Sequence, residues 1–230
     1  MLKQVRPFSL PAPPIWHDDG NCPEEGPAEQ TILKTVMTNY TKQILPQKHG
    51  LQAKVEMHIN DIPNLSELQS EFVLDLMYSE MWTDRRLAYN NLSIARCIKN
   101  ITLDLDYMGK LWSPNTCIVN SKSAVIHSSP SDNVFLILYE DGTVWKNCRM
   151  MVKAPCSIDL RAFPFDRQEC IMVFESYSYN SRRLQLQWFK EPITLLKKME
   201  LPDFKLVDYK AERYTVEYPN GLWDQLKVSG

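Results

Sequence analysis

The stretch CSIDLRAFPFDRQEC, residues 156–170, places thirteen residues between two cysteines. A disulfide between Cys156 and Cys170 would close them into a loop, and chain-entropy estimates put the stabilisation at about 3 kcal/mol. Two aromatic side chains on either side of a proline would make a rigid apolar knob, which on an exposed surface favours a binding partner. An ordinary hairpin disulfide with a buried tip is the alternative. The tip would consist of Phe163, Pro164, Phe165 and Asp166.

On both sides of this stretch, apolar residues alternate with polar ones, which is typical of half-buried β-strands. Residues 134–139 are nearly all apolar and meet Asp141-Gly142 before 143–145, which predicts a hairpin. Many short strands separated by turn residues indicate a β-sandwich. The alternating residues are Val55, Met57 and Ile59; Phe72, Leu74, Leu76 and Tyr78; Leu103 and Leu105; and Leu184, Leu186 and Trp188.

The N-terminal part of the chain differs from the rest. Residues 1–26 are rich in proline, glycine and acidic residues, and we expect an irregular arm. Over residues 28–45, apolar residues at helix-like spacing predict one amphipathic helix, which Pro27 would start and Pro46 would end. Residues 27–230 would then form one domain without internal repeats.

Composition narrows the class of protein. The 230 residues are 44% hydrophobic, which is enough for one sizeable core. The formal net charge of −2 does not suggest a nucleic-acid partner. No segment approaches the roughly 18 consecutive apolar residues of a membrane helix. The four histidines have neither metal-ligand spacing nor a nucleophile motif around them, so we expect no enzyme activity, metal or cofactor.

Cysteines and sequons predict an extracellular protein. The six cysteines include no CxxC pair, which fits disulfides better than zinc or redox chemistry. Besides Cys156 and Cys170 there are four, which allow three pairings; Cys22–Cys97 with Cys117–Cys148 is one option, and free thiols are another. Four N-x-[ST] sequons add to the expectation of secretion and of glycosylation. They begin at Asn39, Asn64, Asn91 and Asn100.

The pattern around the 156–170 loop resembles that of Cys-loop receptors, which are pentameric ligand-gated ion channels. Residues 82–87 (WTDRRL) resemble the family's W-x-D-x-R-L stretch, and residues 112–116 (WSPNT) its W-x-P-D-T stretch with Asn115 in place of the aspartate. Residues 175–179 (ESYSY) resemble the E-S-Y-G-Y segment of anion-selective GABA-type subunits. The likeness covers about residues 28–229 and points to the GABA/glycine-like branch, with an invertebrate member expected.

The resemblance implies an Ig-like β-sandwich of about ten strands with an N-terminal helix, assembled as a homo- or hetero-pentamer. A neurotransmitter would bind between neighbouring subunits on the extracellular side of the plasma membrane, at a synapse. Residue 230 falls where the first membrane helix of the family would begin, so we expect the pore domain to lie outside this chain. The 59–66 and 156–170 loops would press on that pore domain, the second of them through Phe163, Pro164, Phe165 and Asp166.

The resemblance also places the ligand site. On the principal face, aromatic rings around one carboxylate would make a cage for an ammonium group. Cys117 stands where the family has an aromatic residue, and its neighbour Val119 would line the site instead. For any single aromatic residue, core packing is the alternative, and for Glu175 a solvated strand charge. The principal residues are Glu175, Ser176, Tyr177, Tyr218 and Trp223, the last two on a capping loop at 218–223 that lacks the vicinal cysteines of nicotinic subunits.

On the complementary face the expected residues are Met77, Ser79, Asn147 and Arg149. GABA, glycine and glutamate receptors commonly have an arginine at the position of Ser79, and a serine cannot bind a carboxylate bidentately. Arg149 could substitute, although a structural role is an alternative. We therefore expect a biogenic amine or choline-type cation as the ligand. The alternatives are an amino-acid-gated subunit, a subunit that serves assembly, and a secreted binding protein of the same fold.

Overall fold

The computed structural model describes residues 25–48, 50–199, 201 and 203–230. These contain α1 (Glu25–Met37) and α2 (Leu105–Met108), and neither helix has the length and apolar character needed to cross a membrane. Two 3-10 turns span Arg85–Leu87 and Ser93–Ala95. The strands are β1 (Leu51–Ser66), β2 (Glu71–Thr83), β3 (Asn100–Leu103), β4 (Thr116–Ile118), β5 (Ser123–Ile126), β6 (Val134–Tyr139), β7 (Thr143–Ser157), β8 (Glu169–Ser176), β9 (Leu184–Leu195), β10 (Lys210–Tyr218) and β11 (Gly221–Ser229).

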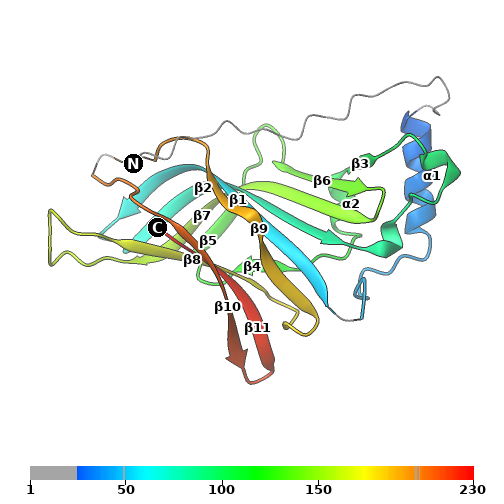
Figure 1. Ribbon diagram of the computed structural model, residues 1–230. Coiled ribbons are helices and arrows are strands. Elements are labelled where there is room, and N and C mark those ends of the chain that lie inside the picture. The colour runs from blue at the N-terminus through cyan, green and yellow to red at the C-terminus, as the bar shows by residue number, and fades with distance from the viewer. Residues whose placement is uncertain (1–24, 49, 200, 202) are drawn as a thin grey trace.

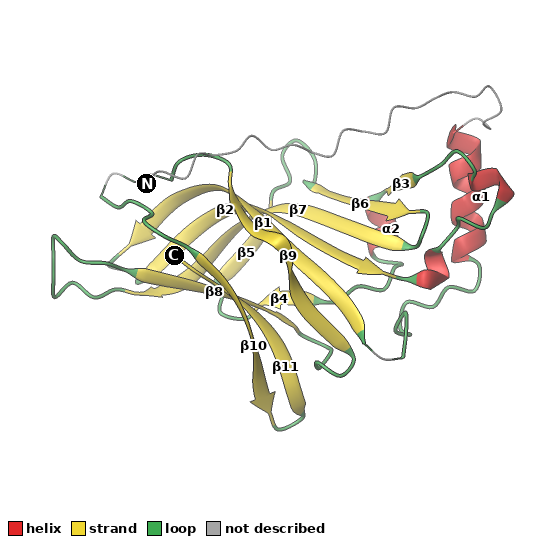
Figure 2. Ribbon diagram, viewed as in Figure 1, coloured by secondary structure: helices red, strands yellow, loops and turns green. Residues whose placement is uncertain are grey.

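The strands form two layers (Figure 1). The first layer has the order β9-β1-β2-β7, and β7 also pairs with β5 and β6, which carries β3. The second layer has the order β4-β8-β11-β10. The two layers are joined where Cys156 of β7 lies opposite Cys170 of β8. This arrangement confirms the predicted all-β sandwich with an N-terminal helix, as Figure 2 shows.

Aromatic side chains pack between the layers. Tyr78 of β2 stacks on Phe174 of β8 with ring centroids 5.4 Å apart, and Trp188 of β9 meets the same phenylalanine edge-on at 6.2 Å. Full burial of side chains of this size contributes about 1.5–3 kcal/mol each. The expected alternation is confirmed on β1 and β9. On β2, however, Val73 and Asp75 are buried too, because this strand lies between β1 and β7 and side chains of those neighbours cover its second face.

The N-terminal helix is shorter than expected and begins earlier. Residues 1–24 lie outside the described residues, and α1 already includes Glu25 and Gly26. It ends at Met37, so the prediction that it continues to Leu45 is wrong. The reason is local: Asn39 adopts a positive φ of 63°, the left-handed conformation that commonly terminates helices. Leu105 was also misassigned to a strand, since it begins the single turn of α2.

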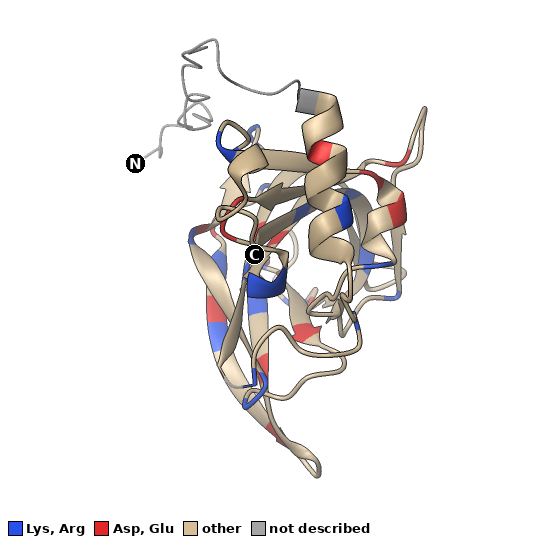
Figure 3. Ribbon diagram, turned by 90° about the vertical axis from the view of Figure 1, so that its right-hand side faces the viewer, with Lys and Arg blue, Asp and Glu red and all other residues tan. Residues whose placement is uncertain are grey.

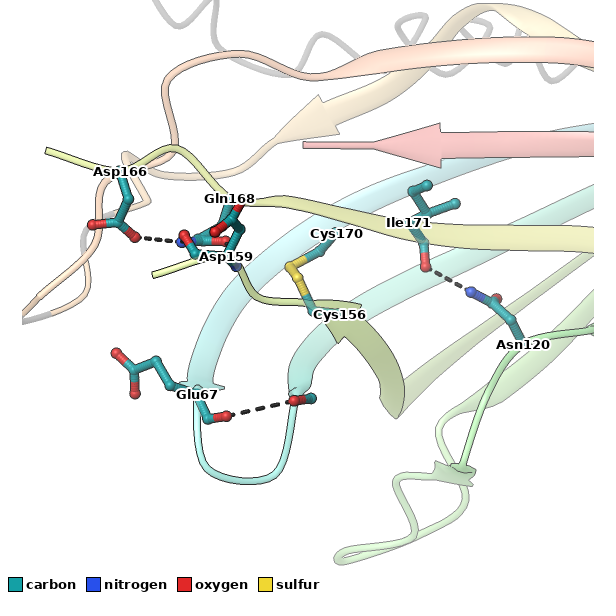
Figure 4. Close-up of a disulfide and its surroundings, with 9 residues drawn as sticks. Glu67, Asn120, Cys156, Asp159, Asp166, Gln168, Cys170 and Ile171 are labelled. Atoms are coloured by element: carbon teal, nitrogen blue, oxygen red, sulfur yellow. Dashed lines mark hydrogen bonds between the residues drawn. A yellow bond between two sulfur atoms is a disulfide. The ribbon is translucent and has the colours of Figure 1, made fainter. Parts of the chain in front are cut away.

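The 156–170 loop lies at the end of the sandwich opposite α1 (Figure 1), and its disulfide is present as expected. Inside the loop, the Gln168 side chain exchanges two hydrogen bonds with the backbone of Asp159, at 2.9 and 3.0 Å, and donates another to Asp166 (Figure 4). Phe163 and Phe165 are 73% and 91% exposed, so the alternative of a buried tip is excluded. The knob is rigid at its base and exposed at its tip.

The segment expected as a second loop at 59–66 is instead the last part of β1. The chain reverses at residues 67–70, where the Ser70 N–H donates to the Glu67 carbonyl at 3.3 Å. Figure 4 shows Glu67 at the same end of the domain as the disulfide. In the view of Figure 3, basic and acidic segments are intermixed along the strands, in line with the small net charge.

Asp84, in the 82–87 segment, is a fully buried carboxylate that joins three parts of the chain. Arg86 donates to both of its oxygens, at 2.9 and 2.7 Å, and the Tyr40 hydroxyl donates to Oδ2 at 2.8 Å. The same hydroxyl accepts from the N–H of Trp112 at 3.0 Å. The Arg86 guanidinium also lies 4.6 Å from the centre of the Tyr40 ring. A buried charge paired in this way is costly to leave without its partner.

We expect Asp84→Asn to lower the free energy of unfolding by about 3 kcal/mol, because Arg86 would lose its bidentate partner inside the fold. Urea denaturation of the two proteins measures the difference. Asp159→Asn is the matched control: its partner, Arg161, is also two residues ahead but lies in solvent. The control should unfold like the wild type. A loss below about 1 kcal/mol at Asp84 would contradict this account of the motif.

Candidate functional site

Four residues on four neighbouring strands form one row across the second layer. Register places Cys117 of β4 opposite Glu175 of β8, Glu175 opposite Gln225 of β11, and Gln225 opposite Tyr214 of β10. Directly opposed residues of antiparallel strands share a face of the sheet. The alternate residues, such as Phe174, belong to the core, so the row lies on the outer face of this layer.

Hydrogen bonds connect the row to the β10–β11 hairpin, which extends away from the sandwich in Figure 1. The Gln225 amide donates to Glu175 Oε2 at 2.6 Å and to the Tyr218 hydroxyl at 3.2 Å. That hydroxyl also donates to the same Oε2 at 3.4 Å. The Tyr218 and Trp223 rings meet edge to face at 6.3 Å, and the Trp223 indole N–H donates to Asn220 Oδ1 at 3.2 Å. A carboxylate, an amide and two aromatic rings therefore converge here.

Within the described part of the chain, Glu175 forms no ion pair with a basic side chain. The nearest basic residues along β10 and β11 have other partners. Arg213 pairs with Asp224 at 2.9 Å, and Lys227 pairs with Glu212 at 3.6 Å. No basic side chain among the described residues therefore neutralises the negative charge of Glu175.

The charge of Glu175 contributes to raising the pKa of a neighbouring thiol and of two tyrosine hydroxyls. Burial raises the pKa of Cys117, and the charge of Glu175 raises it further. The same two causes, in the same order, raise the pKa of Tyr214 and that of Tyr218. Each shift favours the neutral form of the side chain. The row thus presents uncharged walls around a single carboxylate, which is an arrangement suited to a cation.

The other principal residues are placed differently. Tyr177 lies just beyond the end of β8 and is 75% exposed, with its N–H bonded to the Asn115 carbonyl at 2.9 Å. Val119 lies on the same face as Cys117, two residues further along, and is exposed. Ser176 points away from the row: its buried hydroxyl donates to the Pro114 carbonyl at 2.8 Å and accepts from the Tyr179 N–H at 3.2 Å. Ser176 therefore has a structural role, because its hydroxyl links two backbone segments.

The complementary residues lie on β2 and β7 of the first layer, where Met77 is opposite Arg149 and Ser79 is opposite Asn147. Ser79 is fully buried and accepts a 2.7 Å hydrogen bond from the Asn147 amide. Arg149 pairs with both oxygens of Asp75, at 3.1 and 2.6 Å, and these hydrogen bonds lower the pKa of Asp75. Arg149 thus has a structural partner in Asp75, which supports the structural role over binding of a ligand carboxylate.

Of the two disulfides in the expected option, the Cys117–Cys148 bridge is absent, and the alternative of free thiols is confirmed for these two residues. Cys117 and Cys148 are both free, because Cys117 lies on the outer face of the second layer and Cys148 is buried opposite Tyr78 in the first. Cys97 is disulfide-bonded, and its expected partner Cys22 lies outside the described residues. All four sequon asparagines are exposed, as glycosylation requires; their modification remains a prediction for Asn39, Asn64, Asn91 and Asn100. Among the described residues no group of three or more metal-ligating side chains is arranged to hold an ion.

Two residues of the row were missed from the sequence, Gln225 and Tyr214. Because successive side chains of a strand point to opposite faces, Gln225 is expected on the same face as Trp223, and Tyr214 on the same face as Tyr218. Gln225 and Glu175 are 50 residues apart in the sequence, so no local pattern reveals that they lie opposite each other.

The chain combines a two-layer β-sandwich, a disulfide-closed loop at 156–170 and a row of side chains around Glu175 on the outer face of the second layer. Residues 29–228 match the family described as neurotransmitter-gated ion-channel ligand binding domain. The chain belongs to this family of Cys-loop receptor domains.

Three similar proteins come from Caenorhabditis elegans. "Serotonin-gated chloride channel mod-1" is 47% identical over 208 residues, which cover 90% of this chain and 42% of that protein. "Ligand-gated ion channel 50" is 47% identical over 197 residues, covering 86% and 40%. "Acetylcholine-gated chloride channel subunit acc-1" is 40% identical over 210 residues, covering 91% and 44%. The chain spans less than half the length of each of these relatives.

The charge of Glu175 should be measurable through its neighbour Cys117. We expect Glu175→Gln to speed alkylation of Cys117 by iodoacetamide near about pH 8, because the thiol pKa falls and the thiolate is the nucleophile. Burial still acts on the thiol, so the rate stays below that of an exposed cysteine. Site-resolved mass spectrometry against time gives both rates.

Cys148 serves as the internal control for that measurement. It is buried, and burial raises its pKa to about 11, so it should stay unreactive in both proteins. An unchanged or slower reaction of Cys117 in the variant would contradict the claim that the charge of Glu175 raises the pKa of this thiol.

Proposed function

We propose that this chain is the extracellular ligand-binding domain of a subunit of a pentameric anion channel, and that its ligand is a biogenic amine or a choline-type cation. The observation that carries the proposal is the Glu175 carboxylate, which has no basic partner in the described chain and accepts a hydrogen bond from Tyr218, whose ring packs against that of Trp223. The pentamer would display this site at the cell surface, at a synapse.

A cationic ligand fits the site on physical grounds. Each aromatic face attracts a cation by roughly 0.5–2 kcal/mol, and the attraction grows as water is excluded. An opposite unit charge at about 4 Å adds several kcal/mol at the effective dielectric constant of a protein surface. The second contribution requires that the carboxylate be free of an internal counter-ion, as Glu175 is among the described residues.

An amino acid as ligand would need a partner for its own carboxylate. Ser79 is buried and bonded to Asn147, and Arg149 would have to leave Asp75 to become available. The ligands named for two relatives are both cations: serotonin is a protonated primary amine and acetylcholine is a quaternary ammonium ion. Both relatives are named chloride channels. These names support a cationic ligand and an anion-selective pore without deciding between the two kinds of cation.

The proposed mechanism follows the strands. A bound cation would draw the β10–β11 hairpin toward Glu175, and β8 would carry the change toward Cys170 and the 156–170 loop. There Phe163, Pro164, Phe165 and Asp166 would contact the pore domain. A ligand can open the gate only by binding the open state more tightly than the closed one. The site must therefore change its geometry between the two states.

An agonist panel on the full-length subunit expressed alone tests this function: serotonin or acetylcholine should open an anion current, and GABA and glycine should not. For the responding amine, Glu175→Gln should raise the half-maximal concentration by about 10- to 100-fold, the loss expected for a charge-assisted contact.

Glu212→Gln is the matched control for that variant. Glu212 shares the outer face of β10 with Tyr214 but already pairs with Lys227, so its loss should leave the response within about threefold of the wild type. A subunit that responds to GABA or glycine and to neither amine would overturn the proposal.

A further inference from the structure

Gln225 occupies the central position of the row, between the carboxylate and the hairpin. It is 6% exposed and lies opposite Glu175 on one side and Tyr214 on the other. Its amide nitrogen makes the 2.6 Å bond to Glu175 and the 3.2 Å bond to the Tyr218 hydroxyl. One side chain thus sets the position of both the carboxylate and the tyrosine.

The two hydrogen bonds to Glu175 both end on Oε2, from Gln225 and from Tyr218. In the part of the chain that the structure describes, Oε1 accepts none. A carboxylate held by one oxygen and open at the other presents a fixed acceptor to an incoming ammonium group. Fixing such an acceptor in advance lowers the entropy lost on binding.

The neutrality of the amide is as important as its position. A lysine or arginine at 225 would reach the same carboxylate and also make a charge-assisted pair with it, which would cancel the negative charge. A methionine of similar size would keep the charge but could not hold the carboxylate. Glutamine is the side chain that holds Glu175 without neutralising it.

We infer that Gln225 is a specificity-determining residue of the ligand site: its uncharged amide positions Glu175 and leaves the full negative charge for a cationic ligand. The inference rests on the proposed function, since it concerns how the same site selects a cation. Burial and then the charge of Glu175 raise the pKa of Cys117, Tyr214 and Tyr218, the three neighbours that surround the carboxylate.

The test compares Gln225→Lys and Gln225→Met in the assembled receptor, with serotonin and acetylcholine as probes. Equilibrium displacement binding and current amplitude are both recorded, so that affinity and assembly are measured separately. Affinity should fall in the order wild type, methionine variant, lysine variant, with a loss of at least about tenfold for lysine. Ile44→Lys adds the same charge at an exposed position after α1 and should stay within about twofold of the wild type.

Exchanging the acid at 175 and the amide at 225 tests whether the contact between the two side chains matters beyond their packing. Glu175→Gln combined with Gln225→Glu keeps one acid and one amide opposite each other, so it should recover at least about fivefold of the affinity that Glu175→Gln alone loses. This pair decides the question even if the lysine variant does not fold.

The outcomes distinguish the role of Gln225 from the proposed function. Amine binding by the lysine variant at wild-type affinity, or no recovery in the exchange, would overturn the role of Gln225 and leave the proposed function intact. A wild-type receptor that binds neither amine would overturn the proposed function and this inference together.

Discussion

The register of β8 is the constraint on which the rest of this domain depends. On one side β8 meets β7 at Cys170, where the disulfide joins the two layers, and at its other end it pairs with β4 and β11 at Glu175. These two residues are five positions apart, or about 17 Å along an extended strand. A shift of one residue would turn Glu175 into the core and break its pairing with Gln225. One strand therefore fixes both the base of the exposed knob and the carboxylate of the ligand site.

Three acidic residues differ in the partners that hold their carboxylates. Asp84 is fully buried and held by Arg86 and Tyr40, so its charge serves the structure. Asp75 is paired bidentately with Arg149, in the region that a ligand carboxylate would need. Of the three, Glu175 is the one held only by uncharged donors. Arginine thus neutralises Asp84 and Asp75 and leaves Glu175 available, which is the physical basis for expecting a cation.

What the sequence could predict follows from the range of the interactions involved. Strands β1 and β9 and the β6–β7 hairpin could be predicted because alternation and the Asp141-Gly142 turn signal are local. The end of α1 was missed because the helical spacing of apolar residues continues past Asn39, whose backbone leaves the helix. The Cys117–Cys148 option failed because sequence spacing does not show that the two thiols face different sides of different layers. Likewise, the contact between Glu175 and Gln225 is set by long-range register, so the carboxylate was predicted and its partner was not.

The most direct measurement of the central claim is a structure of the assembled receptor with serotonin or acetylcholine bound. The account predicts the ammonium nitrogen within about 4 Å of the free oxygen of Glu175, with the Tyr218 and Trp223 rings beside it and the Gln225 amide still on the other oxygen. A ligand whose cationic group lies away from Glu175, or a bound carboxylate paired with Arg149 in place of Asp75, would contradict it.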